Sequence, residues 1–370
     1  MPTFTHHAPV NLSATRPSRL SAILLSIFVA LFAFDVDAAS KRKGKSKKRK
    51  KAPIVRVIPD LTKDGKPNVQ SRQAVVIDLD SDEILWARQP DALRPIASIS
   101  KLMASLVVLD SAMDIEAVTT MTETDVRVAR GGAKSRLLPG YRIKNHDLLR
   151  AALLASDNRA ISAMGRSVGM DAVALAAAMT RKAKAIGLKN TRFGDPTGLD
   201  PRNVSTPREV VKLLREAMKN PTLEPIMHTS EYDLPWERGQ GDKAKAGQVH
   251  YINTNRLIRG SPYKILGGKT GYTDEAKYCL VTAGEVHGRR IAVSLLNGDG
   301  ELTRFGDFKR IAKYLEKNPP PSIAAPAPPA DGHEGAAVVP FAGTPLAPAP
   351  PASLPFDSED LPAAPATSTQ

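Results

Sequence analysis

Cysteine is almost absent from this chain, which limits how the protein can be stabilised. Cys279 is the single cysteine among the 370 residues, so no intrachain disulfide can form and the folded part must depend on packing. Cys279 lies in an apolar, strand-like stretch, where a free thiol is expected to be a small buried hydrophobe. The seven histidines are scattered, with no His-Glu-x-x-His pattern, and one cysteine cannot build a zinc cluster.

The apolar run near the N-terminus is too short for a comfortable membrane span. It extends from Leu20 to Phe34, follows Arg16 and Arg19, and precedes the small-residue cleavage site Val36-Asp37-Ala38. This layout is typical of a secretory signal, so residues 1–38 are assigned to a signal peptide. The alternative is an uncleaved N-terminal anchor. In both cases the folded part is exported across the inner membrane, and we expect it in the periplasm, with peripheral membrane association left open.

A basic tract follows the signal. Nine lysines and arginines lie between Lys41 and Lys51, so they account for most of the formal net charge of +14. The tract has no apolar periodicity, and residues 39–67 are assigned to a disordered basic linker. Such a run could bind nucleic acid, but an exported protein meets anionic lipid or wall polymer instead. A solvated linker without any partner remains the plainest alternative, and we expect no nucleic-acid partner.

The other end of the chain cannot form a core. Residues 318–370 are rich in proline and alanine and predict a flexible, partly extended tail with no terminal amphipathic helix. The folded segment is therefore residues 68–317, which is enough for one substantial core.

Within residues 68–317, strands are expected at both ends and helices between them. Gln73–Trp86 alternates apolar and polar residues around a turn at Ser81-Asp82 and predicts a β-hairpin. Apolar spacing and start signals predict helices over 97–113, 147–155, 160–187 with an interruption near 168–169, and 207–218. Late strands are expected near 278–283 and 290–296, followed by a helix over 301–315. This order predicts an α+β fold: one antiparallel sheet from the N- and C-terminal segments, a central helical block, and a cleft between them.

Three short motifs occur in order across this segment: Ser98-Ile99-Ser100-Lys101, Ser156-Asp157-Asn158 and Lys269-Thr270-Gly271. Residues three apart share a helix face, so Lys101 can lie beside the Ser98 hydroxyl. A serine needs a base to become a nucleophile, and Lys101 can be that base only if its pKa is lowered by burial or by a second cation, for which Lys269 is the candidate. In isolation, a helix-capping serine followed by a solvated lysine explains the first motif equally simply.

The second and third motifs supply the remaining parts of an acyl-transfer site. Ser156 could pass a proton to a leaving nitrogen, and the carboxamide of Asn158 could bond a substrate amide. Lys269 and Thr270 are expected just before a strand, where glycines such as Gly271 let an extended peptide add to the sheet edge. The Tyr272 N–H would be an oxyanion donor beside that of Ser98. In isolation, a helix-to-loop cap and a surface turn explain these two motifs.

Two other patterns are less convincing. Gly165-Arg166-Ser167-Val168-Gly169 matches a nucleophile elbow in letters, but it falls in an alanine-rich helical stretch and not at a strand-to-helix turn. Glu216 and Asn220 match the spacing of a deacylating Glu-x-x-x-Asn, but they fall at the end of an expected helix.

The chain resembles the low-molecular-mass penicillin-binding proteins, the D-alanyl-D-alanine carboxypeptidase and endopeptidase family of serine peptidases. The resemblance covers about residues 71–315 and includes the residues flanking the motifs, in the segments 95–103, 155–160, 195–206, 253–257 and 269–281.

The resemblance implies a β-lactamase-like transpeptidase fold with no metal and no organic cofactor. It implies that Ser98 is the acyl-forming nucleophile, Lys101 its proton acceptor and Ser156 the shuttle, while Lys269 and Thr270 hold a carboxylate of the peptide. The implied substrates are peptidoglycan stem peptides and cross-links, with β-lactams as covalent inhibitors.

The resemblance leaves the reaction subtype open. Many carboxypeptidase members carry a second β-rich domain and a C-terminal amphipathic anchor, whereas one domain with a Pro/Ala tail resembles the endopeptidase type, which cuts existing cross-links. The alternatives are a carboxypeptidase that trims stem peptides and a non-catalytic peptidoglycan-binding protein with an idle site.

Overall fold

The computed structural model describes residues 58–319, and the fold discussed here is confined to them. The predicted signal peptide, the Lys41–Lys51 tract and the predicted tail from residue 320 onward lie outside the described residues. Residues 58–67, which the sequence assigned to the linker, form a turn closed by an antiparallel bridge between Leu61 and Pro67.

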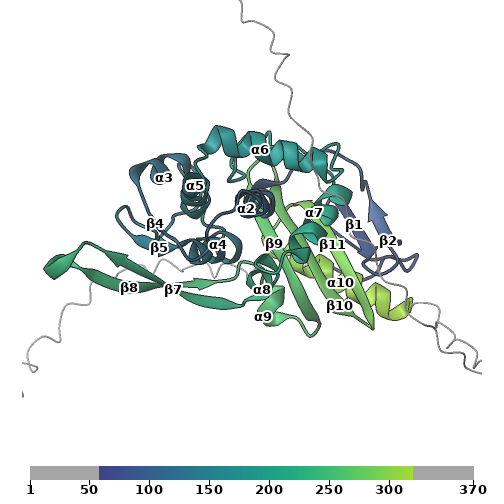
Figure 1. Ribbon diagram of the computed structural model, residues 1–370. Helices are drawn as coiled ribbons and strands as arrows, with labels where there is room; N and C mark the ends of the chain where they lie inside the picture. Colours follow the sequence, from purple (N-terminus) through teal and green to yellow (C-terminus); the bar gives the residue numbers. More distant parts are fainter. Residues whose placement is uncertain (1–57, 320–370) are drawn as a thin grey trace, which may run out of the picture. The chain divides into compact units, whose positions relative to one another are not determined.

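The main sheet has five antiparallel strands in the order β2-β1-β11-β10-β9, so the two ends of the folded segment meet in its centre (Figure 1). The strands are β1 (Gln73–Asp78), β2 (Ile84–Arg88), β9 (Lys264–Thr273), β10 (Lys277–Val286) and β11 (Arg289–Gly298). The pairing of β1 with β2 confirms the predicted hairpin, and the sheet confirms the α+β expectation. Lys269 and Thr270 lie inside β9, not before a strand, and β9 forms one edge of the sheet.

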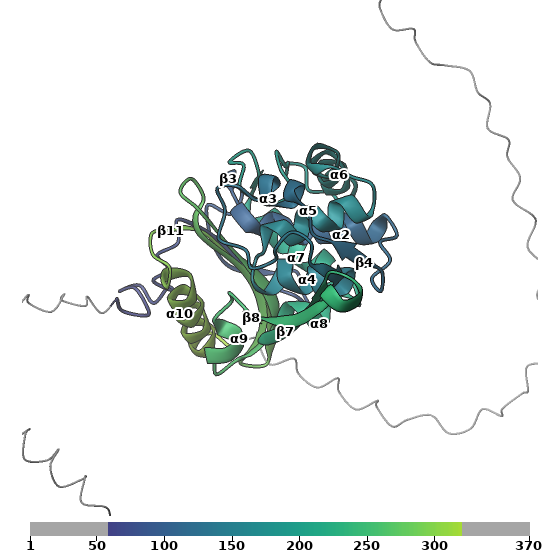
Figure 2. The same cartoon turned by 90° about the vertical axis from the view of Figure 1, so that its left-hand side faces the viewer.

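Both faces of this sheet are covered, which explains why its central strands β10 and β11 are mostly apolar. Residues Leu280, Val293 and Leu295 pack with α10 (Thr303–Lys317) through Phe308 and Ile311. The opposite face carries Cys279, Val281 and Ala283 into the core of the helical block. Figure 2 shows α10, with the short α9 (Leu257–Gly260) beside it, on one side of the sheet and the helical block on the other. A sheet buried on both faces favours apolar residues on both sides of each strand, and the buried polar exceptions in β10 and β11 include Thr282 and Ser294.

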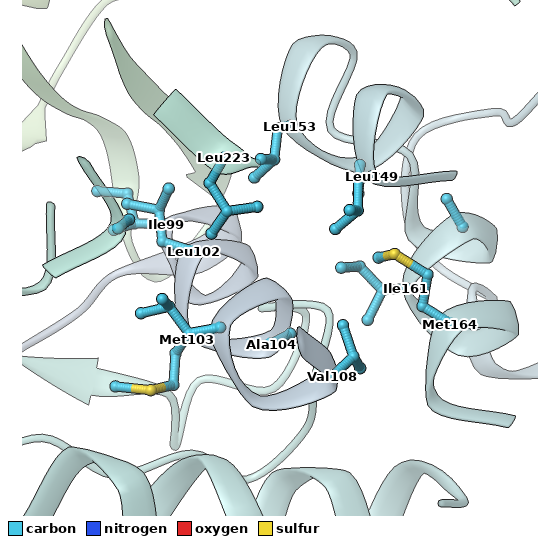
Figure 3. Packing of buried hydrophobic residues seen from close by; sticks show 14 of the residues in the cluster. Ile99, Leu102, Met103, Ala104, Val108, Leu149, Leu153, Ile161, Met164 and Leu223 are labelled. Atoms are coloured by element: carbon cyan, nitrogen blue, oxygen red, sulfur yellow. The ribbon is translucent and has the colours of Figure 1, made fainter. Parts of the chain in front are cut away.

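The helical block is organised around α2 (Ser100–Asp110), whose residues from Ser100 to Val108 are all buried. A helix that is apolar on all sides must be enclosed, and Figure 3 shows Leu102, Met103 and Val108 packed among residues of neighbouring helices. The other helices of the block are α3 (Glu123–Val128), α4 (Asn145–Leu154), α5 (Asn158–Ser167), α6 (Ala172–Ala185), α7 (Pro207–Lys219) and α8 (Leu223–His228). The short helix α9 is not part of this block, because Leu257 packs in the cluster that contains α10.

The helix boundaries follow the local signals in the sequence. Thr206 caps α7 by accepting a hydrogen bond from the Glu209 N–H at 3.2 Å, with Pro207 in the first turn. The predicted interruption near residues 168–169 separates α5 from α6. The first predicted helix is divided into a short 3-10 turn, Ala97–Ile99, and α2.

A second sheet was not anticipated from the sequence. It contains β4 (Val118–Thr120), β5 (Arg142–Lys144), β7 (Glu231–Arg238) and β8 (Lys245–Ile252), and β7 and β8 form a long hairpin that projects at the left of Figure 1. A two-stranded sheet joins β3 (Arg94–Pro95) to β6 (Val204–Ser205). Pro235 interrupts the apolar alternation of β7, and β8 is mostly exposed, so neither has a strong strand signal.

The start of the folded segment is anchored to α10 by Asp307. This fully buried carboxylate accepts hydrogen bonds from the Gln70 N–H at 2.8 Å, from the Ser71 N–H at 2.7 Å and from the Ser71 hydroxyl at 2.7 Å. It also pairs with Arg310 at 2.9 Å. Buried charges are tolerated only when they are fully paired in this way.

Replacing Asp307 should therefore destabilise the fold. We expect Asp307→Ala to lower the free energy of unfolding by about 3 kcal/mol, because Arg310 and the two N–H groups lose their acceptor. The matched control is Asp299→Ala, which removes an exposed ion pair to Arg72 and should cost less than about 1 kcal/mol. Urea denaturation followed by circular dichroism measures both, and equal losses for the two variants would contradict the anchoring role.

Candidate active site

Ser98 is held on the 3-10 turn immediately before α2, at the junction of the helical block and the main sheet. The preceding residue, Ala97, has φ of +48°, an unusual conformation for a residue with a side chain. Gly198 approaches this turn so closely that a Cβ atom on it would lie 2.2 Å from the Ala97 carbonyl oxygen. Glycine at 198 is thus required by the close packing that fixes the nucleophile turn.

Lys101 lies one turn further on, and its amine is completely buried. The Lys101 Nζ atom is 2.8 Å from the Ser98 Oγ, 2.6 Å from the Asn158 Oδ1 and 2.6 Å from the Thr197 carbonyl oxygen. Burial lowers the pKa of Lys101 to about 7, and the carboxylates of Asp195 and Asp157 partly oppose that shift. A substantial fraction of the amine is therefore neutral near pH 7 and able to accept a proton from Ser98.

Ser156 and Asn158 come from the short connection between α4 and α5. Asp157 caps α5 by accepting from the N–H groups of Arg159 and Ala160, at 2.9 and 3.3 Å. Ser156 has φ of +63°, and its hydroxyl accepts a hydrogen bond of 2.9 Å from Lys269. Asn158 bonds Lys101, so in this structure its carboxamide positions the base.

Lys269 is the second buried amine of the site. Besides Ser156 it donates to the Thr270 carbonyl oxygen at 2.9 Å, and its side chain is almost inaccessible. Burial holds the pKa of Lys269 well below its usual value, and repulsion from Lys101 and Arg304 adds to this effect. For Lys101 itself, burial and not the charge of Lys269 is the main cause of the lowered pKa.

Thr270, Gly271 and Tyr272 continue β9 past the nucleophile. The Thr270 hydroxyl donates to the Thr254 hydroxyl at 2.6 Å. A Cβ atom on Gly271 would lie 2.8 Å from the Ile96 carbonyl oxygen and 3.1 Å from the Ser98 nitrogen, so the strand passes directly over the nucleophile turn. Tyr272 is half exposed, and its ring lies 4.4 Å from that of Tyr278.

A cleft of about 950 Å³ opens beside these groups. It is lined by Ser98, Ser156 and Asn158 from the helical side and by residues 270–275 from β9 and the turn after it. All the residues predicted for the site except the buried amines Lys101 and Lys269 line this cleft, and those two amines contact residues that do.

The structure adds residues that the motifs did not identify as part of the site. Thr197 and Thr254 contact Lys101 and Thr270, respectively, and Arg304 donates to the carbonyl oxygens of Gly271 at 3.0 Å and Cys279 at 3.3 Å. Thr197 acts through its backbone, which no side-chain pattern reveals. Arg304 lies in the first turn of a helix with no distinguishing motif around it.

The competing patterns do not form sites. Gly165 and Ser167 are in α5, and the Ser167 hydroxyl bonds the Met164 carbonyl oxygen at 2.7 Å, as expected for a helical serine. Glu216 is in α7, and Asn220 is its C-cap. Over residues 58–319 no three metal-ligating side chains cluster. In the same range no helix combines the length and apolar character needed to cross a membrane.

The fold and this geometry define a class: a serine acyl-transfer enzyme in which a buried lysine, not a histidine, takes the hydroxyl proton. The solved structures support this class. The Streptomyces K15 DD-transpeptidase matches with a TM-score of 0.63 and 26% identity, covering 68% of this chain and 99% of that chain. A D-alanyl-D-alanine carboxypeptidase from Mycobacterium tuberculosis matches with a TM-score of 0.59 and 27% identity, covering 68% of this chain and 92% of that one.

Sequence comparison narrows the class. The family model described as D-alanyl-D-alanine carboxypeptidase matches residues 60–300. A D-alanyl-D-alanine endopeptidase from Pseudomonas aeruginosa is 34% identical over 70% of this chain and 81% of its own length. One from Escherichia coli is 32% identical over 68% of this chain and 79% of its own length. The chain belongs to the D-alanyl-D-alanine carboxypeptidase family and is a serine D-alanyl-D-alanine peptidase.

The lowered pKa of Lys101 predicts a pH dependence for acylation. Protonation removes the base, so the second-order rate of acylation by penicillin should fall as the pH drops through about 7 and level off above it. Stopped-flow measurements between pH 5 and 9 test this. Lys101→Arg, which cannot deprotonate, should be at least about 100-fold slower at every pH. A flat profile for the wild type would show that the amine is not the base.

Lys269 provides a second kinetic prediction. Lys269→Ala removes a cationic partner for a carboxylate and the hydrogen bond to Ser156, and should cost roughly 2–4 kcal/mol in the transition state for acylation. The control is Lys264→Ala on the same strand, whose exposed amine pairs with Glu285 at 2.8 Å. Penicillin acylation rates compare the two, and a Lys269→Ala rate close to that of the control would exclude this role.

Proposed function

We propose that this protein is a D-alanyl-D-alanine endopeptidase that hydrolyses the peptide cross-links of peptidoglycan through an acyl-Ser98 intermediate. The observation that carries the proposal is the buried Lys101 amine 2.8 Å from the Ser98 hydroxyl, at the base of an open cleft. The similarity to proteins named endopeptidase supports the choice of substrate.

The residues suit each step of acyl transfer. Neutral Lys101 takes the proton of Ser98 as the Oγ atom bonds the carbonyl carbon of the scissile D-alanyl bond, and the carbonyl electron pair moves to oxygen. The N–H groups of Ser98 and Tyr272 stabilise that oxyanion. Collapse of the intermediate breaks the C–N bond, and the proton reaches the leaving nitrogen through Ser156. Water then attacks the acyl-Ser98 ester by the reverse proton path and releases the new carboxylate.

Lys269 and Thr270 are suited to hold the carboxylate on the leaving side of the bond. Lys269 has its amine beside Ser156, and Thr270 has its hydroxyl at the cleft surface near Thr254. Carboxylate binding would favour the charged form of Lys269, because an anion offsets the burial that lowers its pKa.

The second candidate is a carboxypeptidase that removes a terminal D-alanine from stem peptides. It is favoured by the family model and by relatives such as the carboxypeptidase DacF of Bacillus subtilis, 30% identical over 65% of this chain and 62% of its own length. The endopeptidases of P. aeruginosa and E. coli are 34% and 32% identical, more than this carboxypeptidase, which supports the first candidate. A non-catalytic wall-binding role is opposed by the complete set of site contacts.

The proposal includes a location and partners. An N-terminal signal peptide would place the protein in the periplasm, where it would meet its substrate, and the tract from Lys41 to Lys51 would add electrostatic contact with anionic membrane or wall polymer. The family binds β-lactams, and here these would acylate Ser98.

Mass spectrometry of purified muropeptides distinguishes these activities. We expect the wild type to convert cross-linked dimers to monomers, and Ser98→Ala to leave them intact. Loss of one alanine from pentapeptide monomers with dimers unchanged would assign the carboxypeptidase instead. Fluorescent penicillin is the parallel readout: it should label the wild type and not Ser98→Ala, and an unlabelled, well-folded wild type would refute the acyl-serine mechanism.

A further inference from the structure

A second cavity of about 340 Å³ adjoins the main cleft, and no step described so far uses it. It lies between the loop of residues 133–136 and the end of β8, and we call it the side lobe. The side lobe and the cleft share part of their lining, namely Ala133, Ala155, Ser156, Ile252 and Thr254. The two spaces are therefore neighbours at the level of the catalytic residues.

Two of the shared residues connect the side lobe to the proposed carboxylate-binding pair. Ser156 accepts the hydrogen bond from Lys269 at 2.9 Å, and Thr254 accepts the one from Thr270 at 2.6 Å. A carboxylate held by Lys269 and Thr270 would lie directly beside the entrance to the side lobe. The rest of that leaving group could then extend from the main cleft into the lobe.

The walls of the side lobe are held in place before any ligand arrives. The buried Asp157 carboxylate accepts from the Ser135 hydroxyl at 2.6 Å and from the Tyr251 hydroxyl at 2.9 Å, which ties the loop to β8. The Arg136 guanidinium lies 4.9 Å from the centre of the Tyr251 ring and donates to the His250 carbonyl oxygen. A prearranged pocket of this kind loses little entropy on binding.

The rim of the side lobe carries positive charge. Lys134 and Arg136 both line it and are exposed. The nearest acidic groups on β7, Asp233 and Glu231, lie 2.8 and 3.9 Å from the His250 ring nitrogens and are not part of the lining. The Asp157 carboxylate at the floor is already bonded to two hydroxyls and two N–H groups. An anionic ligand segment is thus favoured at the rim.

We propose that the side lobe is the subsite for the leaving strand of a cross-link, and that Lys134 and Arg136 select an anionic peptide there. This inference rests on the proposed endopeptidase function, because a carboxypeptidase releases only free D-alanine and has nothing to place in the lobe. A wall stem peptide bears free carboxylates and suits this charge.

The test compares the full-length wild type with two variants, Lys134→Glu and Arg136→Ala. Lys134 is an exposed residue in a loop. The control is Lys189→Glu, an exposed lysine that lines neither cavity and changes the net charge equally. Three substrates are used: a cross-linked dimer, the same dimer with the carboxylates of its leaving strand amidated, and fluorescent penicillin, which has no leaving strand.

We expect Lys134→Glu to raise KM for the charged dimer by about fivefold or more with little change in kcat, and Arg136→Ala to have a smaller effect in the same direction. For the amidated dimer, KM should be the same for Lys134→Glu as for the control variant Lys189→Glu. The rate of labelling by penicillin should also be the same for these two variants. Equal KM values of Lys134→Glu and Lys189→Glu for the charged dimer would overturn the subsite while leaving the endopeptidase function intact. If the wild type labels with penicillin but leaves every dimer uncut, the proposed function fails and the subsite falls with it.

Discussion

The site depends on the burial of the Lys101 amine away from water, because this burial lowers the pKa of the amine. Among the described residues the Lys101 amine forms hydrogen bonds with three groups, the Ser98 hydroxyl, the Asn158 carboxamide and the Thr197 carbonyl. Lys101 belongs to α2, whose residues from Ser100 to Val108 are all buried. The helical core and the position of Asn158 therefore place a buried amine, with its pKa lowered to about 7, beside the Ser98 hydroxyl.

The same requirement explains why the site is assembled from distant segments. One helix start can place a serine and a lysine on a common face, but it cannot desolvate the lysine by itself. The connection between α4 and α5 contributes Ser156 and Asn158, and β9 supplies Lys269 from the sheet. Lys269 in turn lies near Lys101 and Arg304, and any positive charge on those two basic side chains adds to the burial that already disfavours a charge on Lys269. A bound anion is the natural complement of such a group.

Much of this could be predicted from the sequence because the signals are local. The alternation of apolar and polar residues predicts the hairpin of β1 and β2. Thr206 is a typical capping residue at the start of α7, and a glycine marks the division between α5 and α6. The three motifs identified every side chain that contacts the Ser98 hydroxyl or the two buried amines. The hairpin of β7 and β8 was missed because exposed strands need little apolar patterning. Thr197 was missed because its contribution is a backbone carbonyl, and Arg304 because long-range packing, not sequence spacing, brings it to β9.

β9 is an edge strand, and its central residues from Gly267 to Gly271 are nevertheless buried. Unpaired strand edges invite self-association, in which the sheet of one molecule extends into that of another. Here residues 267–271 of the β9 edge are buried. The register between β9 and β10 also shifts near Gly267 and Gly268, which adopt φ of +144° and +156°. A single extended chain can reach such an edge, whereas the sheet of a second folded copy meets the walls of the cleft first. A recessed edge that would admit a peptide is therefore also one through which two copies of the sheet cannot readily join at β9.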